Sequence, residues 1–504
     1  MVREKQLHEL LAGLGRPMVC VVGDFMLDTY VWGRVSRVSP EGPIPVLLAV
    51  HREHRPGGAG SVAAMLCALG AQVSCVGVAG QDEAGRELRR RLQAAGANTS
   101  GLVTCDGRPT TLKTRYLGYV QSAGRGQQQM LRVDEETVRP ISAAQTKEVL
   151  AKVNRLAKDA DVVLIQDMAK GLCSPKLLHA IIRDAASRKT PVLVDPERGE
   201  DYTPYKGATC LVPNRFEAET ATGLPMDLPE QWSKAARRLL RKLSLKAVVI
   251  KLDRDGMFFA TAGGEERHMP TRARDVTDVT GAGDMVAAVM AMAMAADAPL
   301  EQGIELANFA AGIEVTRYGA AAVSRAELLE EIEGETDPAK RKIKTRHQLS
   351  DILAERRARG QKIAFTNGCF DLLHLGHVEL IRHARRQGDC LVVGVNSDRS
   401  ARQLKGPGRP INSQDVRART LASLSDVDYV VVFDEVSVLP LIRDVRPEVL
   451  VKGGDYDKKG VVGWEFVESY GGQVKLAPQV RGLSTTELIR KISGKDEGKD
   501  RKGS

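Results

Sequence analysis

The sequence lacks the features that mark secreted, membrane-spanning or disulfide-stabilised proteins. No CxxC pair and no dense cysteine framework occur among its 504 residues. The N-terminal segment MVREKQLHEL has neither the apolar core nor the cleavage site of a secretion signal. The longest apolar run, Met285–Ala296, is about half of the roughly 20 residues that a membrane span needs. These absences favour a cytoplasmic protein with no membrane partner.

Motifs of two common nucleotide-binding folds are missing as well. The sequence contains no Walker A motif, and no GxGxxG follows a predicted strand, so P-loop and dinucleotide-binding folds lack support. The charge is only mildly positive, with 73 Lys and Arg residues against 64 Asp and Glu residues. Anionic small molecules account for that excess as well as nucleic acid does, and we expect no nucleic-acid partner.

The composition is that of a globular protein, with 43% apolar residues and a length that predicts two to four domains. Most cysteines lie in apolar stretches such as Met18–Val22 and Asp389–Val393, where a reduced thiol in the core is expected. The eight cysteines occupy positions 20, 67, 75, 105, 173, 210, 369 and 390.

Short runs rich in Val, Ile and Leu alternate with helical patterns such as Glu83–Ala95 and Ser174–Arg188. Nearly continuous apolar runs are typical of strands buried on both faces of a parallel sheet. The predicted strands are Met18–Gly23, Val73–Val78, Asp161–Gln166, Pro191–Asp195, Cys210–Pro213 and Ala247–Lys251. The alternation predicts an α/β layered domain over residues 1–333. Alternating apolar residues in Val31–Val50 predict a small additional β-element.

This pattern stops near Glu333. Residues 334–346 are polar and charged and contain Pro338, which predicts a linker. A second, smaller α/β domain is predicted over residues 347–493, with helical patterns at His377–Gln387 and Gln414–Leu424. Its predicted strands are Lys362–Thr366, Cys390–Val395, Tyr429–Phe433 and Val449–Lys452. Residues 494–504 are charged and lack apolar anchors, which predicts a disordered tail.

A glycine-containing segment, Thr280–Asp284, comes directly before the apolar helical run. Gly281 and Gly283 allow close approach of a ligand, and the first amides of a helix can bind an anion. A carboxylate at Asp284 would repel a phosphate, but it could accept the proton of a sugar hydroxyl that attacks a γ-phosphate. From the residues alone, a glycine-containing turn in which Asp284 only caps the helix explains this segment about equally well.

The first 330 residues or so resemble the ribokinase-like (PfkB) sugar kinases. The resemblance rests on Val22-Gly23-Asp24, Gly57-Gly58, Asn214-Arg-Phe-Glu217 and Gly281-Ala-Gly-Asp284, which match in order and spacing. It implies that Asp284 is the catalytic base and that Gly281, Ala282 and Gly283 form the anion hole. It further implies that Asn214, Arg215, Phe216 and Glu217 bind ATP, with Glu217 organising Mg²⁺ indirectly. Asp24, Asp28, Gly57 and Gly58 would hold the sugar.

Two positions depart from this family's pattern on the sugar side. Ser61 stands where Asn is usual, and Glu197-Arg198 stands where Lys-Gly is expected. Other polar residues could line a phosphosugar pocket or lie in solvated loops, and the sequence does not decide between these readings. They are Arg125, Gln128, Arg132 and Lys170.

A second motif, His374-Leu-Gly-His377, begins a predicted helix after a predicted strand. The two imidazoles are three residues apart and therefore face the same side. Beside a helix N-terminus they suit the stabilisation of charge moving between phosphates. Zinc is a weaker alternative, because Cys369 with the two histidines gives a non-standard spacing and no fourth ligand is evident. Two unrelated helix histidines are a further alternative.

The segment Asn367–His377 resembles nucleotidyltransferases of the cytidylyltransferase-like superfamily, and the resemblance covers about residues 345–493. It implies that His374 and His377 are catalytic and bind nucleotide phosphates. Class I aminoacyl-tRNA synthetases share the HxGH motif, but the KMSKS partner motif is absent here. The resemblance also implies the remaining nucleotide-binding residues, namely Asn367, Gly368, Phe370, Lys405, Arg417, Ser484, Thr485 and Thr486.

The whole chain, in this domain order, resembles the bifunctional heptose 7-phosphate kinase/heptose 1-phosphate adenylyltransferases of bacterial lipopolysaccharide synthesis. The resemblance implies that ATP is a substrate of both halves, that Mg²⁺ is the cofactor, that phosphosugars are the partners, and that the product is ADP-heptose. Two copies could pair through the kinase domain. Two alternatives remain: a related fusion that uses another phosphosugar or CTP, and a regulatory protein with one inactive half.

Overall fold

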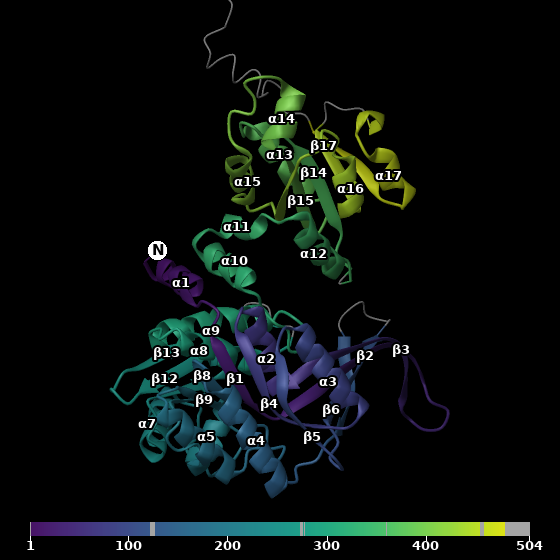
Figure 1. Ribbon diagram of the computed structural model, residues 1–504. Helices are drawn as coiled ribbons and strands as arrows, with labels where there is room; N and C mark the ends of the chain where they lie inside the picture. Colours follow the sequence, from purple (N-terminus) through teal and green to yellow (C-terminus); the bar gives the residue numbers. More distant parts are fainter. Residues whose placement is uncertain are drawn as a thin grey trace, which may run out of the picture. The chain divides into compact units, whose positions relative to one another are not determined.

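The computed structural model describes residues 2–120, 127–272, 276, 278–358, 360–453 and 458–478. The chain divides between Ile332 and Glu333 into two compact units (Figure 1). The predicted fold class was α/β, with a ribokinase-like layered unit followed by a smaller Rossmann-like unit, and both units are α/β.

A nine-stranded sheet forms the centre of the first unit. All neighbouring strands in it are parallel except at one edge, where β11–β12 and β12–β13 are antiparallel. In sheet order the strands are β13 (Glu266–Met269), β12 (Met257–Thr261), β11 (Ala247–Lys251), β10 (Cys210–Leu211), β9 (Val192–Asp195), β8 (Val162–Gln166), β1 (Met18–Gly23), β4 (Gln72–Gly80) and β5 (Asn98–Cys105). Each of the six strands predicted for this half is present.

The order of these strands creates a crevice at their carboxyl ends. Strand β1 lies between β4 and β8, so the chain first builds the sheet on one side of β1 and then on the other. In parallel sheets, ligands bind where the strand order reverses in this way. Asp24 directly follows β1, and Asp167 directly follows β8.

Helices cover both faces of this sheet, and each layer packs on its own apolar core (Figure 1). Helix α8 is buried throughout Met285–Ala293 because it lies in the middle of its layer, against α2 and α9. One layer contains α1 (Val2–Gly13), α2 (Ala59–Ala68), α3 (Glu83–Ala94), α8 (Ala282–Ala295), α9 (Leu300–Glu314) and α10 (Arg325–Thr336). The other contains α4 (Ala143–Leu156), α5 (Pro175–Ser187), α6 (Arg215–Thr222) and α7 (Pro229–Leu243).

A separate four-stranded sheet accompanies the first unit, and we call it the lid sheet. Its order is β3 (Pro45–Gly58), β2 (Phe25–Val38), β6 (Thr111–Val120) and β7 (Gln127–Glu135). The β-element expected within Val31–Val50 is therefore confirmed. Strands β6 and β7 were not foreseen, because their charged residues interrupt the apolar pattern.

The second unit contains a five-stranded parallel sheet. The order is β16 (Tyr429–Phe433), β15 (Cys390–Asn396), β14 (Ile363–Gly368), β17 (Val449–Gly453) and β18 (Gln473–Ala477). The strand order reverses at β14, which places the segment after β14 at the expected ligand-binding edge. The helices are α11 (Pro338–Lys342), α12 (Arg346–Ala358), α13 (Leu375–Arg385), α14 (Asp398–Lys405), α15 (Gln414–Ala422), α16 (Leu439–Val445) and α17 (Trp464–Ser469).

The segment expected to be a linker, residues 334–346, is mostly helical and belongs to the second unit. Ala339 in α11 is buried in the core of this unit. Ile343 forms a β-bridge with Val430. Two small apolar contacts within a charged sequence therefore anchor a segment whose composition alone suggested a solvated connection.

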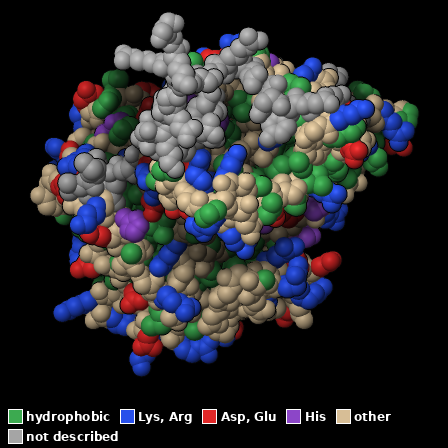
Figure 2. Space-filling model, turned by 90° about the horizontal axis from the view of Figure 1, so that it is seen from above, with side chains coloured by type: hydrophobic (Ala, Val, Ile, Leu, Met, Phe, Trp, Pro, Cys, Tyr) green, Lys and Arg blue, Asp and Glu red, His purple; other side chains and the backbone are tan. Residues whose placement is uncertain are grey.

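The described surface carries charges of both signs. On the face shown in Figure 2, Lys and Arg side chains are interspersed with Asp and Glu. None of the described helices is long and apolar enough to cross a lipid bilayer. All eight cysteines are in the described part of the chain and none forms a disulfide.

Candidate active sites

Asp284 lies in the first turn of α8, three residues after the N-cap residue Gly281. Gly281 is the N-cap residue, with φ 102°, and no side chain caps the helix there. A Cβ on Gly281 would lie 2.5 Å from Oε1 of the buried Glu314, so a larger residue would not fit. The amides that begin α8 are therefore left for a ligand, and Asp284 does not cap its own helix.

The carboxyl group of Asp284 is held by polar side chains from other elements. Gln166 Nε2 at the end of β8 donates to Asp284 Oδ1 (3.4 Å) and to Asp195 Oδ2 (3.0 Å). Burial, together with the negative charge of Asp195, raises the pKa of Asp284 to about 7, although a hydrogen bond with Ser61 works against the rise. A carboxyl group with that pKa can accept a proton near neutral pH, as a general base must.

This pKa predicts the acid side of the pH profile of the first unit. If Asp284 is the base, it must be deprotonated to act, so kcat/KM should rise with pH and level off above about 7. Below that value we expect a loss of about tenfold per pH unit. Initial rates between pH 5 and 9 at low sugar concentration measure the midpoint. A profile already flat at pH 5 would contradict the role of Asp284.

Two charged residues beside Asp284 were not singled out in the sequence. Lys251 Nζ forms an ion pair with Asp195 Oδ1 at 2.7 Å and lies next to Gly283, 3.3 Å from the position of a Cβ there. Burial works to lower the pKa of Lys251, but the carboxylates of Asp195 and Glu217 outweigh it, so its pKa is raised and the side chain stays charged. Each of these residues ends a predicted apolar strand, and that position is the signal that could have identified them.

The predicted ATP-binding segment forms the start of α6. Asn214 and Glu217 make a reciprocal capping box, in which the Asn214 side chain accepts from Glu217 N (2.8 Å) and Glu217 Oε2 accepts from Asn214 N (2.7 Å). Arg215 turns away to the backbone oxygen of Leu252 and to Asp255. Phe216 is 46% exposed, and the guanidinium of Arg198 lies 3.5 Å from its ring centroid.

The carboxylates of Asp195 and Glu217 face the same buried region around Lys251. Burial raises the pKa of Glu217 to about 7, and the nearby Asp195 adds to the rise. Hard carboxylate oxygens of this kind fit Mg²⁺. Because both Glu217 oxygens already accept hydrogen bonds from Asn214, this carboxylate suits an indirect role through water.

The four residues expected to hold the sugar lie around the carboxyl end of β1. Asp24 is 3% exposed, and its Oδ2 accepts hydrogen bonds from Met168 N and Lys170 N, both at 3.0 Å. Asp24 therefore fixes the loop after β8. Asp28 is also buried, and a Cβ on Gly57 would lie 2.6 Å from its Oδ2. Gly58 has φ 55° and packs against the backbone oxygen of Asp24.

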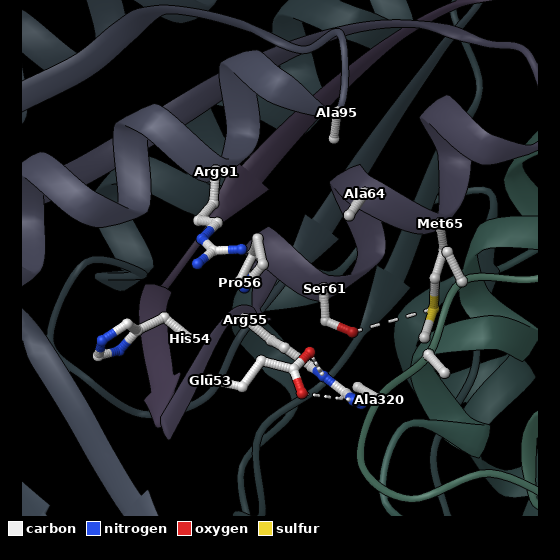
Figure 3. Close-up of a pocket in the computed structure, with 12 residues that line it drawn as sticks. Glu53, His54, Arg55, Pro56, Ser61, Ala64, Met65, Arg91, Ala95 and Ala320 are labelled. Atoms are coloured by element: carbon white, nitrogen blue, oxygen red, sulfur yellow. Dashed lines mark hydrogen bonds and ion pairs between the residues drawn. The ribbon is translucent and has the colours of Figure 1, made fainter. Parts of the chain in front are cut away.

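A cavity of about 320 Å³, lined by both polar and apolar side chains, lies beside Ser61, one of the positions that depart from the kinase pattern. Figure 3 shows the Ser61 side chain directed toward Met65, with Arg55 and Glu53 paired on the same cavity. Arg55 also donates to the backbone oxygen of Tyr318 at 2.5 Å, which ties β3 to the loop that follows α9. Of the other polar candidates, Arg125 lies outside the described residues.

In the second unit, the two histidines stack at the start of α13. Their ring centroids are 3.9 Å apart, and His374 is the N-cap residue without a side-chain cap bond. Nδ1 of each ring is buried and has no protein partner. Burial lowers the pKa of both, that of His377 to about 4 with a further contribution from His374. Two neutral rings with free nitrogens beside a helix N-terminus suit binding of phosphate oxygens.

The other residues predicted from the Asn367–His377 segment surround this pair. Phe370 is buried and packs edge-on against His377, with centroids 5.2 Å apart. The side-chain Oδ1 of Asn367 is buried and has no hydrogen-bond partner. The backbone oxygen of Asn367 accepts a hydrogen bond from Lys452 Nζ (2.9 Å). Gly368 packs against the Phe370 ring. Lys405, at the end of α14, is exposed and close enough to His377 to help lower its pKa.

Arg417 differs from the expected phosphate ligand in its position. Its side chain is 1% exposed, and it donates to the backbone oxygens of Cys369 (2.6 Å) and Asn412 (3.0 Å) and to Asp398 Oδ1 (2.8 Å). The contact with Cys369 holds the loop before α13. We therefore propose that Arg417 supports this loop from the protein interior and so positions the histidines that follow it. The predicted ligands Ser484, Thr485 and Thr486 lie outside the described residues.

We expect Arg417→Met to unfold the second unit at lower denaturant. The change leaves the backbone oxygens of Cys369 and Asn412 without their donor, a loss on the order of 1–3 kcal/mol for each buried acceptor, whereas Asp398 is 36% exposed and can be hydrated. Arg419→Met on the same helix is the matched control, because the Arg419 side chain is 56% exposed and an exposed ion pair such as the one it forms with Asp337 contributes about 1 kcal/mol or less. If Arg417→Met kept full stability and only raised the KM for nucleotide, the guanidinium would be a phosphate ligand.

Comparison with known proteins agrees with both units. The pfkB family carbohydrate kinase model matches residues 16–327, and the cytidylyltransferase-like model matches residues 365–496. The chain is 44% identical to Bifunctional protein HldE of Trichlorobacter lovleyi over 97% of this chain and 98% of that protein. The HldE of Geobacter sulfurreducens is also 44% identical, over 97% and 99% of the two chains.

A solved structure supports the fold of the first unit. Arabidopsis thaliana ribokinase complexed with ribose and ATP superposes with a TM-score of 0.50 and 22% identity, covering 63% of this chain and 99% of that one. The chain therefore belongs to the HldE family of bifunctional proteins, in which a pfkB family carbohydrate kinase is followed by a cytidylyltransferase-like nucleotidyltransferase.

Proposed function

We propose that the protein catalyses two steps toward ADP-heptose. The first unit phosphorylates D-glycero-β-D-manno-heptose 7-phosphate at C1 with ATP. A separate phosphatase then removes the phosphate at C7. The second unit joins the heptose 1-phosphate to AMP from ATP and releases pyrophosphate. The proposal rests on the near full-length match to HldE proteins, combined with a buried carboxyl group at the open start of α8.

In the kinase reaction, Asp284 takes the proton of the anomeric hydroxyl group as its oxygen attacks the γ-phosphorus. The bond to the bridging oxygen breaks, and ADP leaves. The amides that begin α8 and the Lys251 ammonium stabilise the negative charge of the transferring group. Bound Mg²⁺ would neutralise nucleotide phosphate charge near Asp195 and Glu217. Asp28 would orient the sugar.

In the transferase reaction, an oxygen of the sugar 1-phosphate attacks the α-phosphorus of ATP, and pyrophosphate leaves. No residue needs to form a covalent bond, so positioning and charge stabilisation are sufficient. His374 and His377, whose rings stack at the start of α13, donate hydrogen bonds to phosphate oxygens. Lys405 adds positive charge at the same edge of the sheet.

The experiment is incubation of the purified protein with ATP, Mg²⁺ and heptose 7-phosphate, with and without added phosphatase. We expect the 1,7-bisphosphate to accumulate without phosphatase and ADP-heptose to form with it. Absence of the bisphosphate would overturn the kinase assignment. Faster turnover of heptose 1-phosphate with CTP than with ATP would overturn the choice of nucleotide.

We also propose that two copies pair through the lid sheet, in the cytoplasm. Strand β3 lies at the edge of that sheet, and exposed edges invite pairing. Four large apolar side chains on or near β2 and β3 are at least 60% exposed, namely Val38, Ile44, Leu48 and Val50. Light scattering tests this directly, since a monomeric mass at micromolar concentration would contradict it.

A further inference from the structure

The loop that follows α9 supports the glycines that begin α8. Asp278 connects the two segments, because its Oδ1 accepts a hydrogen bond from Thr280 N (3.0 Å) and its Oδ2 accepts one from Gly319 N (2.9 Å). The N-cap residue Gly281 packs directly on this loop, since a Cβ added to it would lie 2.7 Å from Ala320 Cα. The position of the amides that begin α8 therefore depends on where this loop lies.

The lid sheet holds the same loop through two side chains. Arg55 on β3 donates from Nη1 to the backbone oxygen of Tyr318 (2.5 Å), and Glu53 accepts from its Nε and Nη2 at 2.7 and 3.1 Å (Figure 3). Gly319 is buried and has φ 66°. A Cβ on Gly319 would collide with the hydroxyl oxygen of Tyr30 on β2 and would lie 3.1 Å from Arg55 Nη1. Arg55 and Tyr30 thus fix the loop against the lid sheet.

Tyr30 also connects Arg55 to a residue expected to hold the sugar. The Tyr30 side chain is buried, and its ring centroid lies 5.2 Å from Cζ of Arg55 and 5.3 Å from Cζ of Arg115. Arg115 forms a largely buried ion pair with Asp28 (2.8 Å). A continuous series of contacts therefore runs from the carboxylate of Asp28, through the lid sheet and the loop after α9, to the start of α8.

The spacing between these two ends matters for phosphoryl transfer. The attacking oxygen and the phosphorus react when they are held about 3–3.5 Å apart and in line. Asp28 is expected on the side of the sugar, whereas the amides that begin α8 are expected around the transferring group. A misplacement of about 1 Å can cost about a hundredfold in rate. Because Arg55 joins the lid sheet to the loop that supports α8, it is placed to set this spacing.

We propose that Arg55 is a positioning residue for phosphoryl transfer, which holds the amides that begin α8 at the correct distance from the sugar through Tyr318 and Gly319. This inference rests on the proposed kinase function. It predicts an effect on kcat and not on the KM of either substrate. Misplaced amides stabilise the transition state poorly, but they leave both substrate-binding sites present.

The test compares wild type with Arg55→Met, whose side chain is of similar length but cannot donate to the Tyr318 oxygen. We expect kcat to fall about tenfold to a hundredfold, while the KM values for heptose 7-phosphate and ATP stay close to those of wild type. Arg55→Lys, which retains a cationic donor, should recover part of the loss. Arg52→Met is the matched control on the same strand, because Arg52 is exposed and makes no hydrogen bond or ion pair among the described residues.

Gly319→Ala tests the loop independently of Arg55. The added methyl group must displace the loop from Tyr30, so we expect a similar fall in kcat. Its matched control is Gly264→Ala, in the turn between β12 and β13. Gly264 has φ 91° and no neighbouring atom within 4 Å of an added Cβ, so this variant bears comparable backbone strain without moving a neighbour. Gly264→Ala should keep the wild-type kcat, and thermal unfolding shows that both variants fold.

A transition-state analogue separates positioning from substrate binding. ADP with aluminium fluoride and heptose 7-phosphate imitates the transferring group, and its affinity in calorimetric titration should fall in Arg55→Met by the same factor as kcat. An unchanged kcat in folded Arg55→Met or Gly319→Ala would overturn the inference. A rise confined to the KM for heptose 7-phosphate would also overturn it, because Arg55 would then be a sugar ligand. A wild-type protein that binds heptose 7-phosphate without phosphorylating it would instead overturn the proposed kinase function.

Discussion

Replacing Asp284 with Asn will reduce phosphorylation of the sugar by about 10²–10⁴-fold, because the amide cannot accept the proton of the attacking hydroxyl group. The variant should fold normally. Burial already raises the pKa of this carboxyl group to about 7, so a neutral group of the same shape removes the cost of a buried charge. The measurement is the initial rate of ADP release with saturating sugar and ATP.

The control for Asp284→Asn is Asp297→Asn, at the exposed turn after the same helix. Asp297 has φ 51°, a conformation that Asn also adopts readily, so this variant should keep wild-type rates. The transferase activity of Asp284→Asn on supplied heptose 1-phosphate should be intact, since the histidines belong to the other unit. Loss of both activities in a folded protein would mean that the units are coupled.

His377→Asn should lower the transferase rate by about 10²–10³-fold, the usual effect of removing one preorganised donor to a developing charge. His374→Asn should have a similar effect. The rings stack 3.9 Å apart and act as a unit, so the double variant should lose little more than either single variant. Pyrophosphate release from ATP and heptose 1-phosphate measures all three.

His383→Asn provides the matched control on the same helix, because its side chain makes no hydrogen bond or ion pair among the described residues. It should keep the wild-type transferase rate, and all of these variants should phosphorylate the sugar normally. A His377→Asn variant that lost zinc together with activity would support the metal alternative. Elemental analysis of the wild-type and variant proteins decides that point.

Local features of the sequence determined many of the strands and the starts of the two helices that carry the candidate sites. Apolar runs predicted β1, β4, β8, β9, β10 and β11 of the large sheet and β14, β15, β16 and β17 of the smaller parallel sheet, because strands buried on both faces must be apolar along their length. The glycines before α8 and the spacing of His374 and His377 marked the two helix starts. These features can be predicted from one sequence because each depends only on residues close together in the chain. They are the backbone freedom of glycine, the unpaired amides at a helix start, and the helical repeat.

Tertiary structure decided which side chains face each site. Lys251 and Asp195 end separate strands, and only the order of strands in the sheet brings them to Asp284. Arg417 was predicted as a phosphate ligand, and packing places its buried guanidinium on the backbone oxygen of Cys369. Lys113 lies between Asp28 and Asp134, its register partners on the neighbouring strands, and no local pattern in the sequence indicates this arrangement. Pairing of charges between strands depends on register, and register is set by contacts between segments far apart in the chain.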